Sequence, residues 1–212
     1  EVAEIIVADG GSTDRTLEVA RQAGARVISA PQGRGHQIRA GIDNTDAELI
    51  VVLHADSRLE PDAVRRMRDA LSVFDRAPGG ALGMCFEGRA RATRWIARLN
   101  HLRTRWTGIA FGDQGQFFHR AALNAVGGFP ACMLMEDVEL SLRLKQIGRP
   151  LYIKNGIRVS DRRWGREGLG GNIITVIHLC FRYLLLRRLG VTLGDNIGFY
   201  RRYYRRHQTG AE

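Results

Sequence analysis

Short apolar runs alternate with amphipathic segments along the first 87 residues, and this alternation limits the possible folds more than any other feature. Four apolar runs predict strands, at 4–8, 26–29, 49–53 and 81–87. Three amphipathic segments predict helices, at 14–23, 36–43 and from Pro61 to about 73. Strand and helix in turn at this spacing predict an α/β protein with a largely parallel sheet. Ligands of such sheets bind outside the carboxyl ends of the strands.

Two of the predicted strands end in acidic loops. Asp9 follows the first run, and His54 and Asp56 follow the third. If these strands are parallel neighbours, the acids share one edge of the sheet. Residues two apart on a strand lie on the same face, and Mg²⁺ needs few protein ligands besides substrate phosphates. Asp56 with His54 is therefore a candidate metal site, although an acid at a strand end is also typical of a turn or a helix cap.

Three further segments suit a charged substrate, and each also has an ordinary structural interpretation. PQGRGHQ places Arg34 among glycines, where backbone and guanidinium can approach a phosphate. SDRRWGREG carries three arginines and a tryptophan, which suits either a flap over a diphosphate or a solvated turn. Glu136 and Asp137 begin a predicted helix at 136–147, where acids favour the helix dipole. A carboxylate there could also take a proton from a hydroxyl.

The amino-acid composition indicates the cellular compartment and the class of binding partner. The 212 residues suffice for one domain with a full core. Three widely spaced cysteines with no CxxC pair favour a reducing compartment, so we expect a cytoplasmic protein. The net charge is +10, and residues 154–207 carry twelve Lys and Arg against three Asp and Glu, a net charge of +9. A basic segment favours an anionic partner such as a phospholipid surface, and no signature predicts nucleic-acid binding.

Two segments predict amphipathic helices that could meet such a surface. Within residues 90–107, four apolar residues have the spacing of one helix face: Trp95, Leu99, Leu102 and Trp106. Arginines lie between them in the sequence. This face could cover the core, or it could meet a membrane or an acceptor. Residues 172–189 are apolar but interrupted by charge, and their uncharged stretch is too short to span a bilayer comfortably. Peripheral association with the inner face of the cell membrane is therefore one expectation.

Five motifs in order carry a family resemblance: VADGGSTDRT, GRGHQIRAG, LHADSRLEPDA, FGDQGQFFHR followed by AVGGF, and MEDVELSLRLKQIGRP. Together they resemble the family 2 glycosyltransferases, and most resemble a subgroup of small, stand-alone bacterial enzymes. The resemblance implies the GT-A fold, a Rossmann-like, mostly parallel sheet flanked by helices. It also implies an earlier strand, so that the catalytic domain at 1–165 would begin at the family's second strand. A basic, helical segment would follow at 166–212.

The resemblance also implies roles for individual residues. Asp9 with Gly11 and Ser12 would contact the nucleoside, and Arg34 the diphosphate. Asp56 would hold the divalent metal, with His54 standing where the family usually has the first acid of its DXD motif. Asp137 would be the catalytic base, and Glu136 would orient the acceptor. Arg163 and Trp164 would belong to a late loop that closes on the donor. Further departures are Gly10, where a second acid is common, and Arg39, where asparagine is common.

The implied function is transfer of a sugar with inversion, from a nucleoside-diphosphate sugar to a hydroxyl of an acceptor that could be lipid-linked, with Mg²⁺ or Mn²⁺. Two alternatives remain open. One is a sugar nucleotidyltransferase, which shares the fold and the metal acid but not the helix that begins with Glu136 and Asp137. The other is a non-catalytic basic module that binds membranes.

Overall fold

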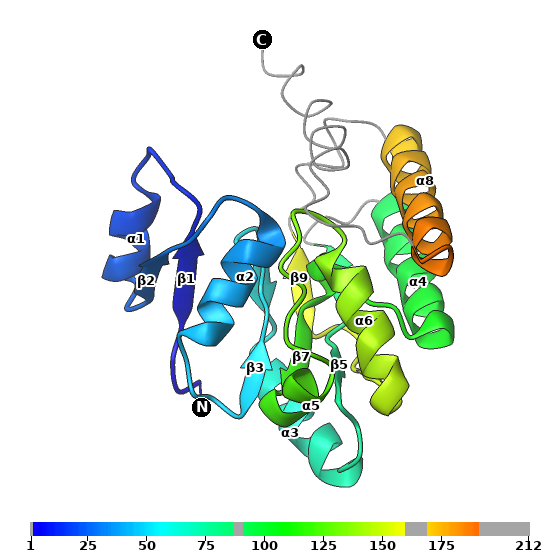
Figure 1. Cartoon of the computed structure of the whole chain (residues 1–212), viewed down its shortest axis with the longest axis horizontal. Helices are drawn as coiled ribbons and strands as arrows, with labels where there is room; N and C mark the ends of the chain where they lie inside the picture. Colours follow the sequence, from blue (N-terminus) through cyan, green and yellow to red (C-terminus); the bar gives the residue numbers. More distant parts are fainter. Residues whose placement is uncertain (1, 87–90, 160–168, 191–212) are drawn as a thin grey trace. The chain divides into compact units, whose positions relative to one another are not determined.

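The computed structural model describes residues 2–86, 91–159 and 169–190 (Figure 1). The chain divides into two compact units, each with its own internal contacts. Unit 1 contains Asp46–Gly128 and Asp137–Leu169, and unit 2 contains Val2–Thr45, Phe129–Glu136 and Gly170–Glu212. The expected division between residues 165 and 166 lies outside the described residues, as do Arg163 and Trp164.

Unit 2 begins with a small β/α arrangement. Its elements are β1 (Ile6–Asp9), α1 (Thr16–Gln22), β2 (Arg26–Ser29), α2 (Arg34–Asp43) and nearly all of α8 (Leu169–Arg188). β1 and β2 pair in parallel, in a register that sets Ile6 opposite Arg26. The helix between them begins after Asp14, whose carboxylate accepts a hydrogen bond from the Thr16 amide at 3.0 Å. It ends before Gly24, whose positive φ of 83° suits glycine. Both ends of α1 agree with the sequence prediction to within two residues.

Helix α2 packs closely against the segment Phe129–Glu136 of the same unit. The Gly35 amide donates a hydrogen bond to the Cys132 carbonyl at 3.0 Å. A Cβ atom on Gly35 would lie 2.3 Å from that carbonyl oxygen and 2.6 Å from the carbonyl oxygen of Pro130. Both neighbours are backbone atoms, so a side chain at this position would force α2 and the segment apart.

We expect Gly35→Ala to lower the free energy of unfolding by about 1–3 kcal/mol, the usual cost of overpacking a close contact. Gly41→Ala on the same helix is the matched control, because its Cβ would meet only the Ala8 Cβ at 3.9 Å. That control should gain about 0.5–1 kcal/mol, since alanine is the better helix former. Denaturant unfolding of both variants measures the difference, and equal stabilities would contradict the packing described here.

Unit 1 holds the remaining elements, in two sheets with helices around them. They are β3 (Leu49–Val51), β4 (Ser57–Leu59), α3 (Ala63–Val73), β5 (Gly79–Ala81), β6 (Met84–Phe86), α4 (Arg91–Thr107), η1 (Gly112–Gln114), β7 (Gln116–His119), α5 (Arg120–Ala125), α6 (Glu136–Ile147, whose first residue belongs to unit 2), β8 (Leu151–Tyr152) and β9 (Ile157–Val159). One sheet has the order β3-β7-β5-β8 and the other β4-β9-β6.

The predicted α/β class is confirmed, with a mixed pairing of strands. Among the described residues, β1/β2, β5/β8 and β6/β9 are parallel, and β3/β7, β5/β7 and β4/β9 are antiparallel. The fraction of strand pairs that are parallel is therefore smaller than the alternation of strands and helices in the sequence predicts. Strands β4, β7 and β9, which the apolar pattern did not predict, take part in the three antiparallel pairs.

Helix α3 supplies one side of the core of unit 1. Ala63, Met67 and Leu71 recur every four residues, so they form one apolar face of the helix, and all three are buried. That face packs with the buried residues of the neighbouring elements: Ala77, Leu82, Met84, Phe117, Ile157 and Val159. The core thus joins α3 to both sheets of the unit.

The single strand predicted at 81–87 is wrong, because Gly83 divides it. The chain passes from β5 in one sheet to β6 in the other, and Gly83 between them has a φ of 26°. A Cβ at this position would lie 2.4 Å from the Tyr152 hydroxyl oxygen. Only glycine allows the backbone this turn beside the Tyr152 ring, and the apolar run continues through it without any break in hydropathy.

Both segments form helices, α4 and α8, and both leave apolar side chains exposed. Trp95, Leu99, Leu102 and Trp106 of α4 are 62%, 58%, 48% and 85% exposed. This face therefore does not cover the core. Ile177, Phe181 and Leu185 of α8 are exposed as well. Within the described part of the chain, neither helix combines the length and apolarity needed to cross a bilayer.

Candidate active site

Asp137 is held rigidly in the first turn of α6. Its side chain is only 7% exposed. One carboxylate oxygen accepts a hydrogen bond from the Gly112 amide at 2.7 Å, and the other accepts one from the Val138 amide, also at 2.7 Å. Gly112 is 25 residues away in the sequence, in η1, so tertiary structure fixes this carboxylate. Because both oxygens are oriented by backbone groups, the side chain has one defined position, as a catalytic base requires.

A buried polar network behind Asp137 holds the start of α6. The Gln116 side-chain amide donates to the Asp137 carbonyl oxygen at 3.0 Å and to the Ser141 hydroxyl at 3.0 Å. The Ser141 hydroxyl donates to the same Asp137 carbonyl at 2.8 Å, and it accepts from the Ala110 amide at 3.0 Å. These contacts tie α6 to β7 and to the loop that precedes η1.

Gln114 organises the other side of η1, within the FGDQGQ motif. Its side chain is fully buried. The carbonyl oxygen of that side chain accepts hydrogen bonds from the Phe111 amide at 2.8 Å, from the Arg103 guanidinium at 3.0 Å and from the Thr104 hydroxyl at 3.0 Å. The Arg103 guanidinium also lies 3.6 Å from the centre of the Phe111 ring. Sequence reasoning assigned no role to Gln114 or Gln116; two glutamines beside the apolar pair FF of β7 were the signal that could have identified them.

His54 and Asp56 lie in the turn between β3 and β4. The strand ends at Val51, three residues before His54, and the Ser57 amide donates to the His54 carbonyl at 3.0 Å. The expectation that both side chains extend from one face of a strand is therefore wrong. Asp56 is exposed and accepts a long hydrogen bond, 3.2 Å, from the Ser57 hydroxyl.

The exposed carboxylate of Asp56 fits Mg²⁺ or Mn²⁺ in the manner expected for a nucleotide complex. Within the ranges that the structure describes, no three or more His, Cys, Asp or Glu side chains gather into a metal site. A fully protein-built cage is thus not present in those ranges. Mg²⁺ is usually bound by one or two carboxylates together with substrate phosphates and water, and a single exposed acid at a turn meets that requirement.

Asp9 uses its carboxylate to close its own loop. It accepts hydrogen bonds from the Gly11 amide at 2.8 Å, from the Ser12 amide at 3.0 Å and from the Ser12 hydroxyl. The hydroxyl bond, followed by the two amide bonds, lowers the pKa of Asp9 below its ordinary value. The Gln37 side chain of α2 supports the loop by donating to the Ala8 carbonyl at 3.0 Å. The acid at this strand end thus shapes a turn, and its contact with a nucleoside stays a prediction.

Arg34 and Glu136 form a buried ion pair within unit 2. The guanidinium lies 2.7 Å from a carboxylate oxygen of Glu136, and the side chains are 25% and 1% exposed. The pair joins the start of α2 to the residue that precedes Asp137. Arg34 was predicted to meet a diphosphate, and in the structure it meets a carboxylate. Glu136 in turn is held in place beside the candidate base.

The candidate residues fall in both units. Asp9, Gly11, Ser12, Arg34 and Glu136 belong to unit 2, and His54, Asp56 and Asp137 belong to unit 1. Unit 1 brings Asp137 together with Gly112, and unit 2 brings Arg34 together with Glu136. The family resemblance implies that Asp9, Asp56 and Asp137 serve one donor and acceptor site, and their convergence around one cleft stays a prediction.

The fold is that of the GT-A glycosyltransferases. A similar solved structure is that of glucosyl-3-phosphoglycerate synthase from Mycobacterium tuberculosis, in complex with Mn²⁺, uridine-diphosphate-glucose and phosphoglyceric acid. The TM-score is 0.56 and the sequence identity 21%, over 90% of this chain and 70% of that one. At this identity, the likeness concerns the fold.

Residues 1–127 match the model of glycosyl transferase family 2, and the chain belongs to that family. One relative is glycosyltransferase AglJ of Haloferax volcanii, 36% identical over 112 residues, or 51% of this chain and 35% of that protein. Another is the undecaprenyl-phosphate 4-deoxy-4-formamido-L-arabinose transferase of Pseudomonas paraeruginosa, 28% identical over 142 residues, or 61% of this chain and 40% of that protein. The chain therefore spans little more than a third of the length of these two relatives.

Proposed function

We propose that this chain transfers a sugar from a nucleoside-diphosphate sugar to the hydroxyl of an acceptor, with inversion at the anomeric carbon. The observation that carries the proposal is the buried carboxylate of Asp137, fixed by two backbone amides at the start of α6 in a member of glycosyl transferase family 2. A fixed carboxylate next to an acceptor hydroxyl is the group that a single displacement at the anomeric carbon needs.

In this mechanism, Asp137 takes the proton of the acceptor hydroxyl while the hydroxyl oxygen attacks the anomeric carbon. The bond from that carbon to the diphosphate oxygen breaks on the opposite face, and the nucleoside diphosphate leaves with the electron pair. Glu136, held by Arg34, orients the acceptor. Asp56 would hold Mg²⁺ or Mn²⁺, which when bound offsets the charge that develops on the leaving diphosphate.

The donor and acceptor classes rest on the relatives. The mycobacterial neighbour was solved with Mn²⁺ and UDP-glucose, which supports a nucleotide sugar and a divalent metal for this chain. We assign the nucleoside to the loop of Asp9, Gly11 and Ser12, and the diphosphate to the neighbourhood of Arg34, with Arg163 and Trp164 closing on the donor. The Pseudomonas relative is named for undecaprenyl phosphate, which supports a lipid-linked acceptor.

The donor assignment predicts a metal-dependent rise in the melting temperature. A saturating nucleotide sugar at about 100 times its Kd stabilises a protein by about 2.7 kcal/mol, which corresponds to roughly 5–10 °C for a chain of this size. The measurement is a panel of UDP-, GDP- and dTDP-sugars, each with and without Mn²⁺. At least one donor should raise the melting temperature, and the rise should shrink when Mn²⁺ is removed.

The alternative function, a sugar nucleotidyltransferase, predicts a different outcome. Such an enzyme binds a nucleoside triphosphate and a sugar phosphate and releases pyrophosphate. Pyrophosphate release from that pair, with no hydrolysis or transfer from any nucleotide sugar, would replace the proposal. If no donor in the panel raises the melting temperature, the proposal of transfer from a nucleotide sugar loses its support.

Peripheral binding to an anionic membrane is a second part of the proposal, and the exposed face of α4 supports it. Its tryptophans and leucines are solvent-exposed, and arginines lie between them, as on helices that lie in the bilayer interface. Burial of a large apolar side chain contributes about 1.5–3 kcal/mol, which is roughly tenfold or more in affinity.

Vesicle flotation measures this binding. Trp106→Ala should reduce binding to vesicles with anionic lipid by roughly tenfold, whereas Phe74→Ala, which removes an exposed aromatic from the end of α3, should not. The folded state should tolerate both changes because both side chains are exposed. Equal binding by both variants, or equal binding to neutral vesicles, would count against α4 as the docking face.

A further inference from the structure

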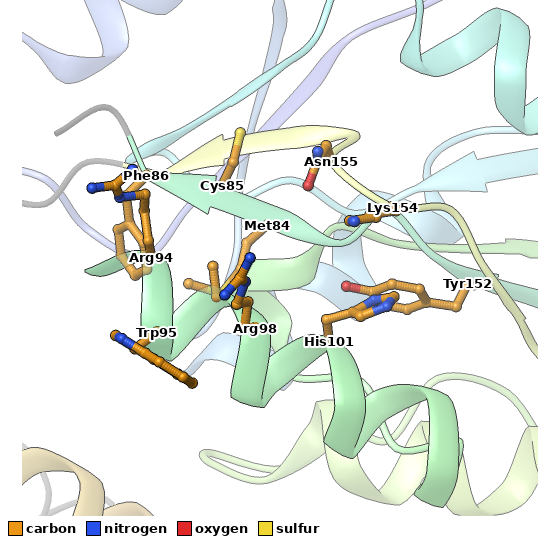
Figure 2. A pocket seen from close by; sticks show the side chains of 11 residues that line it. Met84, Cys85, Phe86, Arg94, Trp95, Arg98, His101, Tyr152, Lys154 and Asn155 are labelled. Carbon is orange, nitrogen blue, oxygen red and sulfur yellow. The ribbon is translucent and has the colours of Figure 1, made fainter. Parts of the chain in front are cut away.

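A separate cavity in unit 1 lies between α4, β6 and the turn that joins β8 to β9. Its volume is about 790 Å³, within the range of small-molecule sites. The walls come from Met84–Phe86, from one side of α4 and from Tyr152, Lys154 and Asn155 (Figure 2). Neither Asp56 nor Asp137 lines it. The cavity thus plays no part in the mechanism described above.

Three cationic side chains line this cavity: Arg94 and Arg98 from α4, and Lys154 from the turn. In Figure 2, Arg98 rises from α4 and Lys154 extends toward the middle of the pocket from the other side. Among the residues that the structure describes, no carboxylate lines the cavity. No acid among those residues forms an ion pair with Arg94, Arg98 or Lys154. Elsewhere in unit 1, Arg66, Arg143 and Arg158 each lie against an acid.

The turn that carries Lys154 is held in place from outside the cavity. The Arg66 guanidinium of α3 donates to the Lys154 carbonyl at 2.8 Å and to the Asn155 carbonyl at 2.8 Å. Asn155 has a φ of 54°, a left-handed conformation that asparagine tolerates. Arg66 is itself anchored by Asp62 at 3.1 Å. The ammonium group therefore extends from a fixed backbone rather than from a loose loop.

The lining of the cavity combines cationic and apolar side chains. Burial lowers the pKa of His101, and the charges of Lys154 and Arg105 lower it further. The His101 ring lies 4.9 Å from the Tyr152 ring, centre to centre. Met84, Phe86 and Trp95 add apolar surface beside the cations. The guanidinium of Arg98 and the ammonium of Lys154, next to apolar walls, match a phosphate joined to an organic group better than they match a bare ion.

We propose that the cavity lined by Arg94, Arg98 and Lys154 binds a phosphomonoester. The phosphate lies between Arg98 and Lys154, and its organic part extends toward Phe86 and Trp95. The ligand is either a soluble phosphate ester or the headgroup of a phosphorylated lipid, since both present the same dianion to these side chains.

Titration calorimetry on the full chain, with no nucleotide sugar or metal present, tests the proposal. The probes are inorganic phosphate, glycerol 3-phosphate and short-chain phosphatidic acid, with glycerol as the uncharged control. We expect at least one ester to bind more tightly than inorganic phosphate, and glycerol to give no heat. Glycerol 3-phosphate as the tighter ester would identify a soluble ligand, and phosphatidic acid as the tighter ester would identify a lipid.

Arg98→Gln and Lys154→Gln, singly and together, assign the binding to this cavity. The double variant should weaken the tightest ester at least tenfold, because each hydrogen bond between charged groups contributes this much. Arg65→Gln, on the exposed side of α3, removes the same charge at a distance and should change the Kd less than twofold. Melting curves identify any variant that fails to fold, in which case the single variants carry the test.

Two outcomes would overturn the proposal: no ester binds the native chain at millimolar concentration, or Arg65→Gln weakens binding as much as the cavity variants do. Asp137→Asn separates this proposal from the proposed function. It should leave the affinity for the ester unchanged while sugar transfer is lost, so either proposal can fail without the other.

Discussion

Asp137→Asn should lower the rate of sugar transfer by roughly 10²–10⁴-fold, the usual contribution of a general base. Asparagine keeps the size of the side chain but cannot accept the proton of the acceptor. It can also satisfy only one of the two amides, of Gly112 and Val138, that now donate to the carboxylate. We therefore expect a loss of stability of about 1–3 kcal/mol alongside the loss of rate. The measurement is the rate of transfer at saturating donor, together with a denaturation curve.

Glu139→Gln is the control for the loss of one negative charge from helix α6. It removes a carboxylate two residues further along α6, where Glu139 pairs with Arg143 at 2.8 Å. Transfer should stay within a few-fold of the native rate, because Glu139 pairs with Arg143 and makes neither of the amide contacts that hold Asp137. Equal losses in the two variants, or full activity of folded Asp137→Asn, would show that Asp137 is not the base.

Asp56→Asn should reduce transfer on the order of 10²-fold or more, because a metal ion supplies several kcal/mol of charge stabilisation at the leaving diphosphate. The native fold should be unaffected, since Asp56 is exposed and accepts a long bond from Ser57. Rates measured against Mn²⁺ concentration give the test, and the variant should require far more metal. Asp69→Asn, an exposed acid on α3, should behave like the native chain.

An unchanged metal requirement in folded Asp56→Asn would contradict the assignment of the metal to this turn. A lower rate at an unchanged metal requirement would instead indicate a structural role for Asp56. The two results differ in the shape of the Mn²⁺ curve, so the rate at a single metal concentration does not suffice.

Local sequence pattern was enough to predict most of the helices, although it did not predict α5. α3, α4 and α6 begin and end within a few residues of their predicted bounds, because their apolar spacing and acidic or glycine boundaries are local signals. Strands β4, β8 and β9 have two or three residues each, and their partners lie far away in the sequence. Their formation depends on those partners, so no local window contains the signal. Gly83 shows the same limit, since its role depends on Tyr152.

The candidate site was predicted in part for similar reasons. The motif around Glu136 and Asp137 identified a carboxylate that two backbone amides hold in place. The sequence did not predict that Gly112 fixes that carboxylate, or that Gln116 and Ser141 support the turn behind it, because these contacts join separate elements. The pairing of Arg34 with Glu136 was missed as well, since each residue had been given a separate role.

The central claim is that Asp9, Asp56 and Asp137 face one metal-bearing cleft, and paramagnetic broadening by Mn²⁺ tests it most directly. The chain is labelled with ¹⁵N and titrated with Mn²⁺ in the presence of UDP, with Mg²⁺ as the diamagnetic reference. The account predicts that the amides of Gly11, Ser57, Gly112 and Val138 all lose intensity together. Broadening confined to Ser57 and its neighbours, with Gly112 and Val138 unchanged, would contradict it.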